Sequence, residues 1–262
     1  MSNVKMNFKE SISQIVNPNI LIGKSFTTAL NNDVNNIQFT DEYDFVELPC
    51  GALEELDKQI NRCVQFNKMF ALHYPSYHSV KVAGDVILEN TEIVLNDILN
   101  YVIKYPECLY VVVHFPFEPF SELNSIEEKK VSTVFKMFSD TLGIYSEKVI
   151  VENLSVHRYC NTATHFNLLW KTTKTSLNMC FDIGHAFLVD GMNEVCNFFD
   201  ELNNKIVAMH LYNTTRNNQS VIYGKHLTLQ HEAGEINFND VWSNLNKLPN
   251  LRFIIDESLT NY

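Results

Sequence analysis

The sequence predicts an α/β fold, a closed (β/α)8 or TIM barrel, formed by one domain over residues 1–262. Two observations indicate this fold. Short apolar, β-branched runs alternate along the chain with stretches of helical periodicity, and there are eight such runs. Near-continuous apolar strands separated by helices form parallel sheets, and eight strand-helix repeats close a barrel. No Gly-, Pro- or Ser-rich linker divides the chain, so a single domain is expected.

The expected strands are short and most of them end near an ionisable residue. In chain order they are ILIGKSF at 20–26, DFVELPC at 44–50, MFALHYP at 69–75, LYVVVHF at 109–115, KVIVENL at 148–154, LNMCFDIGH at 177–185, IVAMHLYN at 206–213 and LRFIIDES at 251–258. Helices are expected in most of the gaps between them, at 53–66, 91–105, 126–142, 165–173, 192–204 and 238–248. Because the chain ends soon after the last strand, the eighth helix is expected to be missing, and an amphipathic segment at 7–16 is expected to cover its place.

Composition restricts the class of protein. The chain has 45% hydrophobic residues, a formal net charge of -11 and six dispersed cysteines without a C-x-x-C pair, which is typical of a reducing compartment. Its first residues carry charges throughout, and no run approaches the roughly 20 apolar residues of a membrane span. The expectation is a soluble, cytoplasmic protein without membrane contact. The acidic balance also argues against a broad surface for nucleic acid.

Ionisable residues gather at the carboxyl ends of the expected strands. They are Glu47, His73, His114, Glu152, Asp182, His185, His210 and Glu257. Barrel enzymes build their active sites at this end, so closure would bring these side chains into one ring. Taken singly, a strand-end histidine is usually a hydrogen-bonded core residue and a strand-end carboxylate a helix N-cap. Burying so many together is costly unless they share protons or a cation, and we therefore expect a metal site.

The donor set indicates the kind of metal. Glu152, Asp182, His210 and Glu257 form a set of three carboxylates and one imidazole, which suits Mn²⁺, Mg²⁺, Co²⁺ or Zn²⁺. Four further histidines remain, which is more imidazole ligands than one hard cation prefers: His73, His114, His185 and His226. A second, zinc-like centre is therefore an open alternative, with Glu152 placed to bridge the two.

The motifs HYPSY, VVVHFP, VIVENL, CFDIGHAF, VAMHLYNT, GKHLTL and FIIDES, in this order and at strand ends, resemble the xylose isomerase-like TIM-barrel superfamily over roughly residues 20–258. That superfamily holds sugar isomerases and epimerases together with endonuclease IV-like apurinic/apyrimidinic endonucleases. The resemblance implies a metal-dependent enzyme. Its two branches imply different chemistry for the same residues.

Resemblance to the epimerase branch implies one divalent metal on Glu152, Asp182, His210 and Glu257. Glu152 and Glu257 would then act as an acid/base pair that moves a proton next to a metal-polarised carbonyl. His185 and Arg216 would contact the substrate, and Glu47, at a strand end, is a further candidate for that contact. The substrate implied is a small sugar, sugar phosphate or polyol, and a homodimer is common among such barrels.

Resemblance to the endonuclease branch implies up to three zinc ions and hydrolysis of a phosphodiester, with nucleic acid as partner. His73 and His114 would bind the first zinc, with Glu152 bridging to a second on Asp182, His210 and Glu257. His185 and His226 would bind a third, although His231 competes with His226 and Gly224 stands where that branch has an aspartate. Gly224 and the acidic balance favour the isomerase or epimerase, and the zinc-dependent hydrolase is the alternative.

Overall fold

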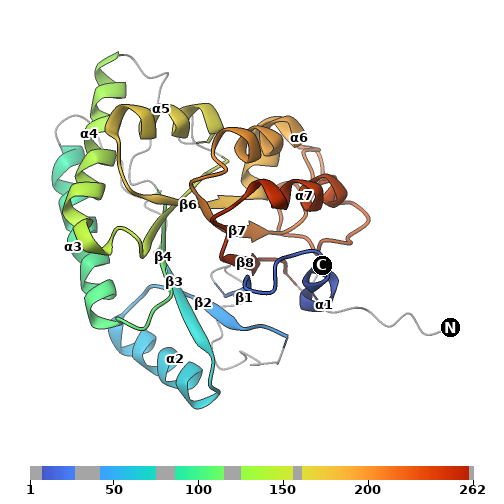
Figure 1. Ribbon diagram of the computed structural model, residues 1–262, viewed down its shortest axis with the longest axis horizontal. Helices are drawn as coiled ribbons and strands as arrows, with labels where there is room; N and C mark the ends of the chain where they lie inside the picture. The colour runs from blue at the N-terminus through green and yellow to red at the C-terminus, as the bar shows by residue number, and fades with distance from the viewer. Residues whose placement is uncertain (1–7, 27–41, 75–85, 115–124, 156–160, 260–262) are drawn as a thin grey trace.

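The computed structural model describes residues 8–26, 42–74, 86–114, 125–155 and 161–259, and its centre is a barrel of parallel strands with helices around it (Figure 1). The strands are β1 (Leu21–Ser25), β2 (Phe45–Pro49), β3 (Met69–His73), β4 (Val111–His114), β5 (Val149–Glu152), β6 (Asn178–Asp182), β7 (Ile206–Leu211) and β8 (Phe253–Asp256). They follow one another in chain order, and β8 pairs with β1 to close the barrel. The predicted fold is confirmed.

Helices connect most of the strands on the outside of the barrel (Figure 1). They are α2 (Leu53–Gln65), α3 (Val86–Lys104), α4 (Ser125–Leu142), α5 (Ala163–Thr173), α6 (Ile183–Glu201) and α7 (Phe238–Asn244), preceded by α1 (Phe8–Ser13). Among the described residues no helix follows β8. Within the same residues, no helix is both long and apolar enough to cross a bilayer.

The N-terminal helix packs against the barrel, as the amphipathic pattern predicts. Ile12 in α1 is wholly buried in the core between strands and helices, and Phe8 and Val16 pack against the same core. Lys9 forms an ion pair with Asp44, whose other carboxylate oxygen accepts a hydrogen bond from the backbone N–H of Ile22. These contacts tie α1 to the residues that begin β1 and β2.

The inside of the barrel has its own apolar core, separate from the core under the helices. It contains Phe45, Ala71, Tyr110, Val112, Ile150, Cys180, Ala208 and Ile255. Side chains two positions apart on a strand point to the same face. Seven of these core residues are therefore followed, two positions later, by an ionisable side chain on the same face: Glu47, His73, His114, Glu152, Asp182, His210 and Glu257. The strand period thus places these side chains above the inner core.

Candidate metal centre

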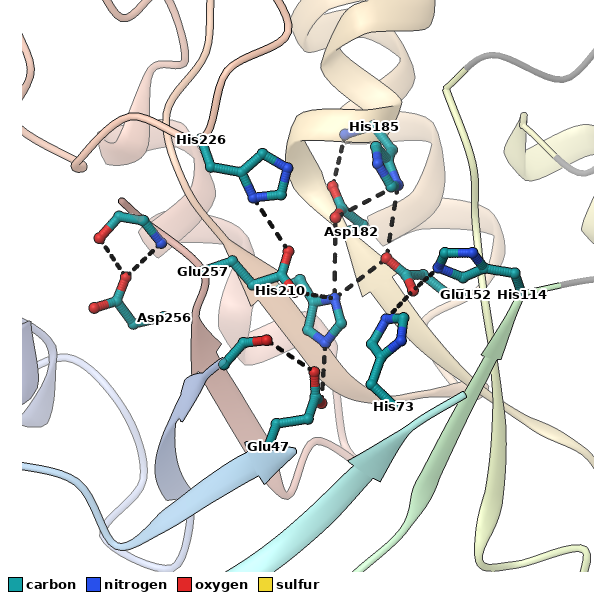
Figure 2. Close-up of polar contacts among 12 residues, drawn as sticks. Glu47, His73, His114, Glu152, Asp182, His185, His210, His226, Asp256 and Glu257 are labelled. Atoms are coloured by element: carbon teal, nitrogen blue, oxygen red, sulfur yellow. Dashed lines mark hydrogen bonds and ion pairs between the residues drawn. The ribbon is translucent and has the colours of Figure 1, made fainter. Parts of the chain in front are cut away.

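The centre of the site is the buried imidazole of His210 on β7 (Figure 2). Its Nδ1 lies near one oxygen of each of three carboxylates: Glu152 Oε1 at 3.2 Å, Glu257 Oε1 at 3.4 Å and Asp182 Oδ2 at 3.9 Å. Strand pairing accounts for part of this convergence, because Asp182 and His210 are register partners on β6 and β7. Side chains as far apart in the sequence as those of Glu152 and Glu257 thus meet at one nitrogen.

The second oxygen of Glu152 faces two further histidines. Glu152 Oε2 lies 3.0 Å from His73 Nε2 and 2.8 Å from His114 Nε2. His114 is the register partner of Glu152 on the neighbouring strand, and the rings of His73 and His114 meet edge to face at 5.0 Å. Glu152 therefore lies between two groups of histidine nitrogens, one at each of its oxygens (Figure 2).

The donor atoms fit a divalent cation. Ligand atoms that share a cation about 2.1 Å away lie roughly 3 to 3.6 Å apart, which is the spacing observed around His210 Nδ1 and Glu152. Among the described residues, the buried atoms Asp182 Oδ2 and His226 Nδ1 have no hydrogen-bond partner, as expected of groups that await a ligand. Two sets of close donor atoms share Glu152: the first is His73, His114 and Glu152, and the second is Glu152, Asp182 and His185.

Comparison with solved structures gives the same architecture. A D-tagatose 3-epimerase-like protein superposes with a TM-score of 0.70 at 17% identity, over 93% of this chain and 92% of that chain. A xylose isomerase domain containing protein from Salmonella typhimurium gives 0.66 at 12% identity, over 92% and 90%. The IolI protein with a bound zinc atom gives 0.68 at 14% identity, over 91% and 89%.

The chain has the fold of the xylose isomerase-like TIM-barrel superfamily. No protein-family model matches it, and no curated protein matches it in sequence. At these identities the structural likeness shows the superfamily fold alone. The chemistry of this chain is inferred from its own residues.

Of the two histidines that compete for one ligand role, His226 lies at the cluster. Its Nδ1 is 3.5 Å from Glu257 Oε2, whereas His231 Nδ1 accepts a hydrogen bond from the backbone N–H of Ala233 in a turn. Gly224 has a φ of +64°, a left-handed conformation that favours glycine. Among the described residues, no set of three close donors contains both His185 and His226. A third zinc site therefore has no support from the described residues.

Two predicted substrate contacts have other partners in the structure. Arg216 directs its guanidinium to the carbonyl of Val189 at 3.4 Å, beside Gly191, where the chain of α6 is kinked. Glu47 is 0% exposed and lies on the opposite side of the His210 ring from Glu152. Neither placement supports the predicted contact.

Three residues that the sequence patterns did not single out support the cluster. Asn153 holds β5 to β6, because its side chain donates to the Asp182 carbonyl and accepts from the Asp182 N–H. Tyr212 stacks on His226, with ring centroids 3.6 Å apart and ring planes 5° from parallel. Asn213 accepts from the Ile236 N–H and donates to the Leu229 carbonyl, which shapes the segment that carries His226. For Asn153 the available signal was its position directly after the predicted ligand Glu152. For Tyr212 the signal was its position two residues after His210, on the same strand face.

The carboxyl groups of the cluster differ in proton affinity. Burial raises the pKa of a carboxyl, but the charges of His114 and His210 hold the pKa of Glu152 well below its usual range. Burial raises the pKa of Asp182 well above its usual range, and the charge of Glu152 acts in the same direction. Burial also raises the pKa of Glu257 to about 7. At neutral pH Glu152 is therefore ionised, and part of the Glu257 population carries a proton.

We expect metal binding to release protons and to weaken as the pH falls. A metal ligand must be deprotonated, and the raised pKa values of Asp182 and Glu257 mean that protons compete with the metal below about pH 7. For each proton that metal binding releases, the apparent metal affinity falls about tenfold for every unit by which the pH is lowered. Calorimetric titration with Zn²⁺ in two buffers of different protonation enthalpy, at pH 6 and pH 8, measures the proton count. An affinity that is the same at both pH values would contradict the expectation.

Gly184→Ala is expected to disturb the support of His226. A Cβ at Gly184 would lie 2.2 Å from the ring of Tyr212, which itself stacks on His226. Overpacking of this kind costs about 1–3 kcal/mol. Urea denaturation measures the change, and Gly51→Ala is the matched control, because nothing lies within 4 Å of a Cβ there. Equal stability of the two variants would contradict the packing described.

Proposed function

We propose that this protein is a metal-dependent isomerase or epimerase of a small sugar or polyol. The supporting observation is the placement of Glu152 and Glu257, from β5 and from just after β8, on either side of His210 Nδ1 at 3.2 and 3.4 Å. Pairs of carboxyl groups whose pKa values are pushed apart are the usual arrangement for acid/base chemistry. Here the pKa of Glu152 is lowered and that of Glu257 is raised to about 7.

The residues of the cluster have two tasks in the proposed reaction, metal binding and proton transfer. Glu152, Asp182, His210 and Glu257 would hold a divalent ion, which supplies Lewis-acid polarisation of a neighbouring carbonyl oxygen when bound. Glu152 is ionised and accepts a proton from the carbon next to that carbonyl. Glu257, whose pKa lies near 7, takes up a proton from solvent once the substrate is bound and returns it to the carbon. The reverse reaction exchanges these roles.

His185 is suited to hold a substrate hydroxyl. Its Nδ1 lies 2.8 Å from the carbonyl of Asn153, which can only accept, so the proton is on Nδ1. Nε2 then carries a lone pair and can accept a hydrogen bond from a hydroxyl. The charges of the described residues favour a neutral sugar over a sugar phosphate, since Lys24 is bound to Asp256 and Arg216 is directed to Val189.

A second candidate function is a zinc-dependent phosphodiesterase of the endonuclease IV type. The observation that favours it is the placement of His73 and His114 at Glu152 Oε2, which resembles a second metal position bridged by one carboxylate. The formal net charge of -11 and the glycine at 224 weigh against it.

Parallel assays on metal-loaded protein distinguish the two functions. The protein is loaded with Mn²⁺, Co²⁺ or Zn²⁺ and incubated in D₂O with a panel of ketoses and aldoses, and proton NMR follows deuterium incorporation next to the carbonyl. The same preparations are tested on an abasic-site duplex and on bis(p-nitrophenyl) phosphate. Exchange that requires metal supports the isomerase. Phosphodiester cleavage without exchange of any sugar would contradict it.

A further inference from the structure

Glu47 is a wholly buried carboxylate on β2 with three hydrogen-bonding partners. Its Oε2 accepts a hydrogen bond from the hydroxyl of Tyr110 at 2.9 Å and lies 3.2 Å from His210 Nε2. Its Oε1 accepts a hydrogen bond from the hydroxyl of Ser25 at 3.2 Å. Figure 2 shows Glu47 on the side of the His210 ring away from Asp182 and Glu152. These partners fix the carboxylate against one nitrogen of the metal-site histidine.

This arrangement determines which nitrogen of His210 faces the cation. A carboxylate can only accept a hydrogen bond, so Nε2 carries the proton that it donates to Glu47. Nδ1 is then the nitrogen left to bind a cation, and it faces oxygens of Glu152, Asp182 and Glu257. A bare lone pair among three carboxylates is unfavourable, so this position holds a positive charge: a proton on Nδ1 when no metal is bound, and the cation in its place when one is.

We propose that Glu47 is a positioning residue for His210: it orients the ring and keeps the proton on Nε2, so that Nδ1 is presented to the metal. The proposal rests on the proposed function, in which His210 binds the ion. Such partners of metal-bound histidines raise metal affinity 10- to 100-fold without touching the ion. Glu47 then acts through His210 and does not contact the substrate, in contrast to the prediction from its strand-end position.

Direct binding of the cation by Glu47 is the competing explanation. Glu47 belongs to a set of close donor atoms with His73, His210 and Glu257. Binding by Glu47 would, however, break hydrogen bonds from two hydroxyls, those of Tyr110 and Ser25, inside the barrel. It would also place the ion at Nε2 of His210, on the opposite side of the ring from Glu152 and Asp182. The observed contacts favour positioning.

The experiment measures Co²⁺ affinity by visible absorption in the full chain and in three variants. We expect Glu47→Gln to bind Co²⁺ about 10- to 100-fold more weakly and Tyr110→Phe to bind it severalfold more weakly. Because Tyr110 acts through Glu47, the double variant should bind no more weakly than Glu47→Gln alone. Tyr105→Phe is the matched control, since its hydroxyl contacts Asp57 outside the barrel, and its affinity should equal that of the wild type.

A second readout reports the proton on His210 directly. Long-range ¹H–¹⁵N correlation spectra of the Zn²⁺-loaded wild type should show the proton of His210 on Nε2. If Glu47→Gln does not fold, Tyr110→Phe is the variant that is compared with the wild type. Wild-type affinity in both Glu47→Gln and Tyr110→Phe would overturn the positioning role and leave the proposed function standing. A proton on Nδ1 would also overturn it. A wild-type protein that binds neither ion would overturn the proposed function and, with it, the role of Glu47.

Discussion

Glu152→Gln is expected to lower metal affinity by at least about 100-fold and proton exchange by about 10³- to 10⁴-fold. Glu152 contacts histidines through both of its oxygens: one faces His210, and the other faces His73 and His114. The amide of glutamine keeps the shape of the side chain but loses the charge that binds the ion and the capacity to accept the substrate proton.

Elemental analysis after dialysis measures the metal content of this variant, and deuterium exchange measures its activity. Glu55→Gln is the control, because Glu55 is an exposed residue of α2 that pairs with Lys58. The control should retain the metal content and activity of the wild type. A Glu152→Gln protein that holds metal as tightly as the wild type would refute the assignment of Glu152 as a ligand.

Glu257→Gln is expected to lower activity by about 10²- to 10⁴-fold and to make metal binding less sensitive to pH. The pKa of Glu257 is about 7, so this carboxyl releases a proton when metal binds near neutral pH. Glutamine has no proton to release. The slope of log affinity against pH should therefore fall by up to about one unit around pH 7, with tighter binding of the wild type at higher pH.

Titrations of wild type and variant with Zn²⁺ from pH 6 to pH 8 measure this slope. Glu201→Gln serves as the control, because Glu201 lies exposed at the end of α6 and contacts Asn167. An unchanged slope in Glu257→Gln would mean that Glu257 does not exchange its proton for the metal, and its assignment as a metal ligand would have to change.

The strand period explains why much of the cluster was predictable from the sequence. Ile150 and Glu152 share one face of β5, and Ala208 and His210 share one face of β7. Once eight parallel strands are recognised, the ends of these faces must meet at one rim of the barrel. Convergence at the rim therefore follows from local patterns together with closure.

The depth of each side chain was not predictable, because it depends on the register between strands. Glu47 pairs with Ala71, two residues before His73 on β3, so it lies deeper in the barrel than His73. Local sequence carries no signal for this offset, and Glu47 was therefore predicted as a substrate contact. The position of Arg216 depends on Gly191 at the kink of α6, because a Cβ there would lie 2.9 Å from the guanidinium.

Anomalous X-ray diffraction from crystals of the Zn²⁺- or Mn²⁺-loaded protein tests the shared cation most directly. We predict a peak about 2.0–2.3 Å from His210 Nδ1 and from oxygens of Glu152, Asp182 and Glu257. A second peak between His73, His114 and Glu152 would favour the zinc-dependent hydrolase over the isomerase. Metal-loaded crystals with no peak bounded by these side chains would contradict the account.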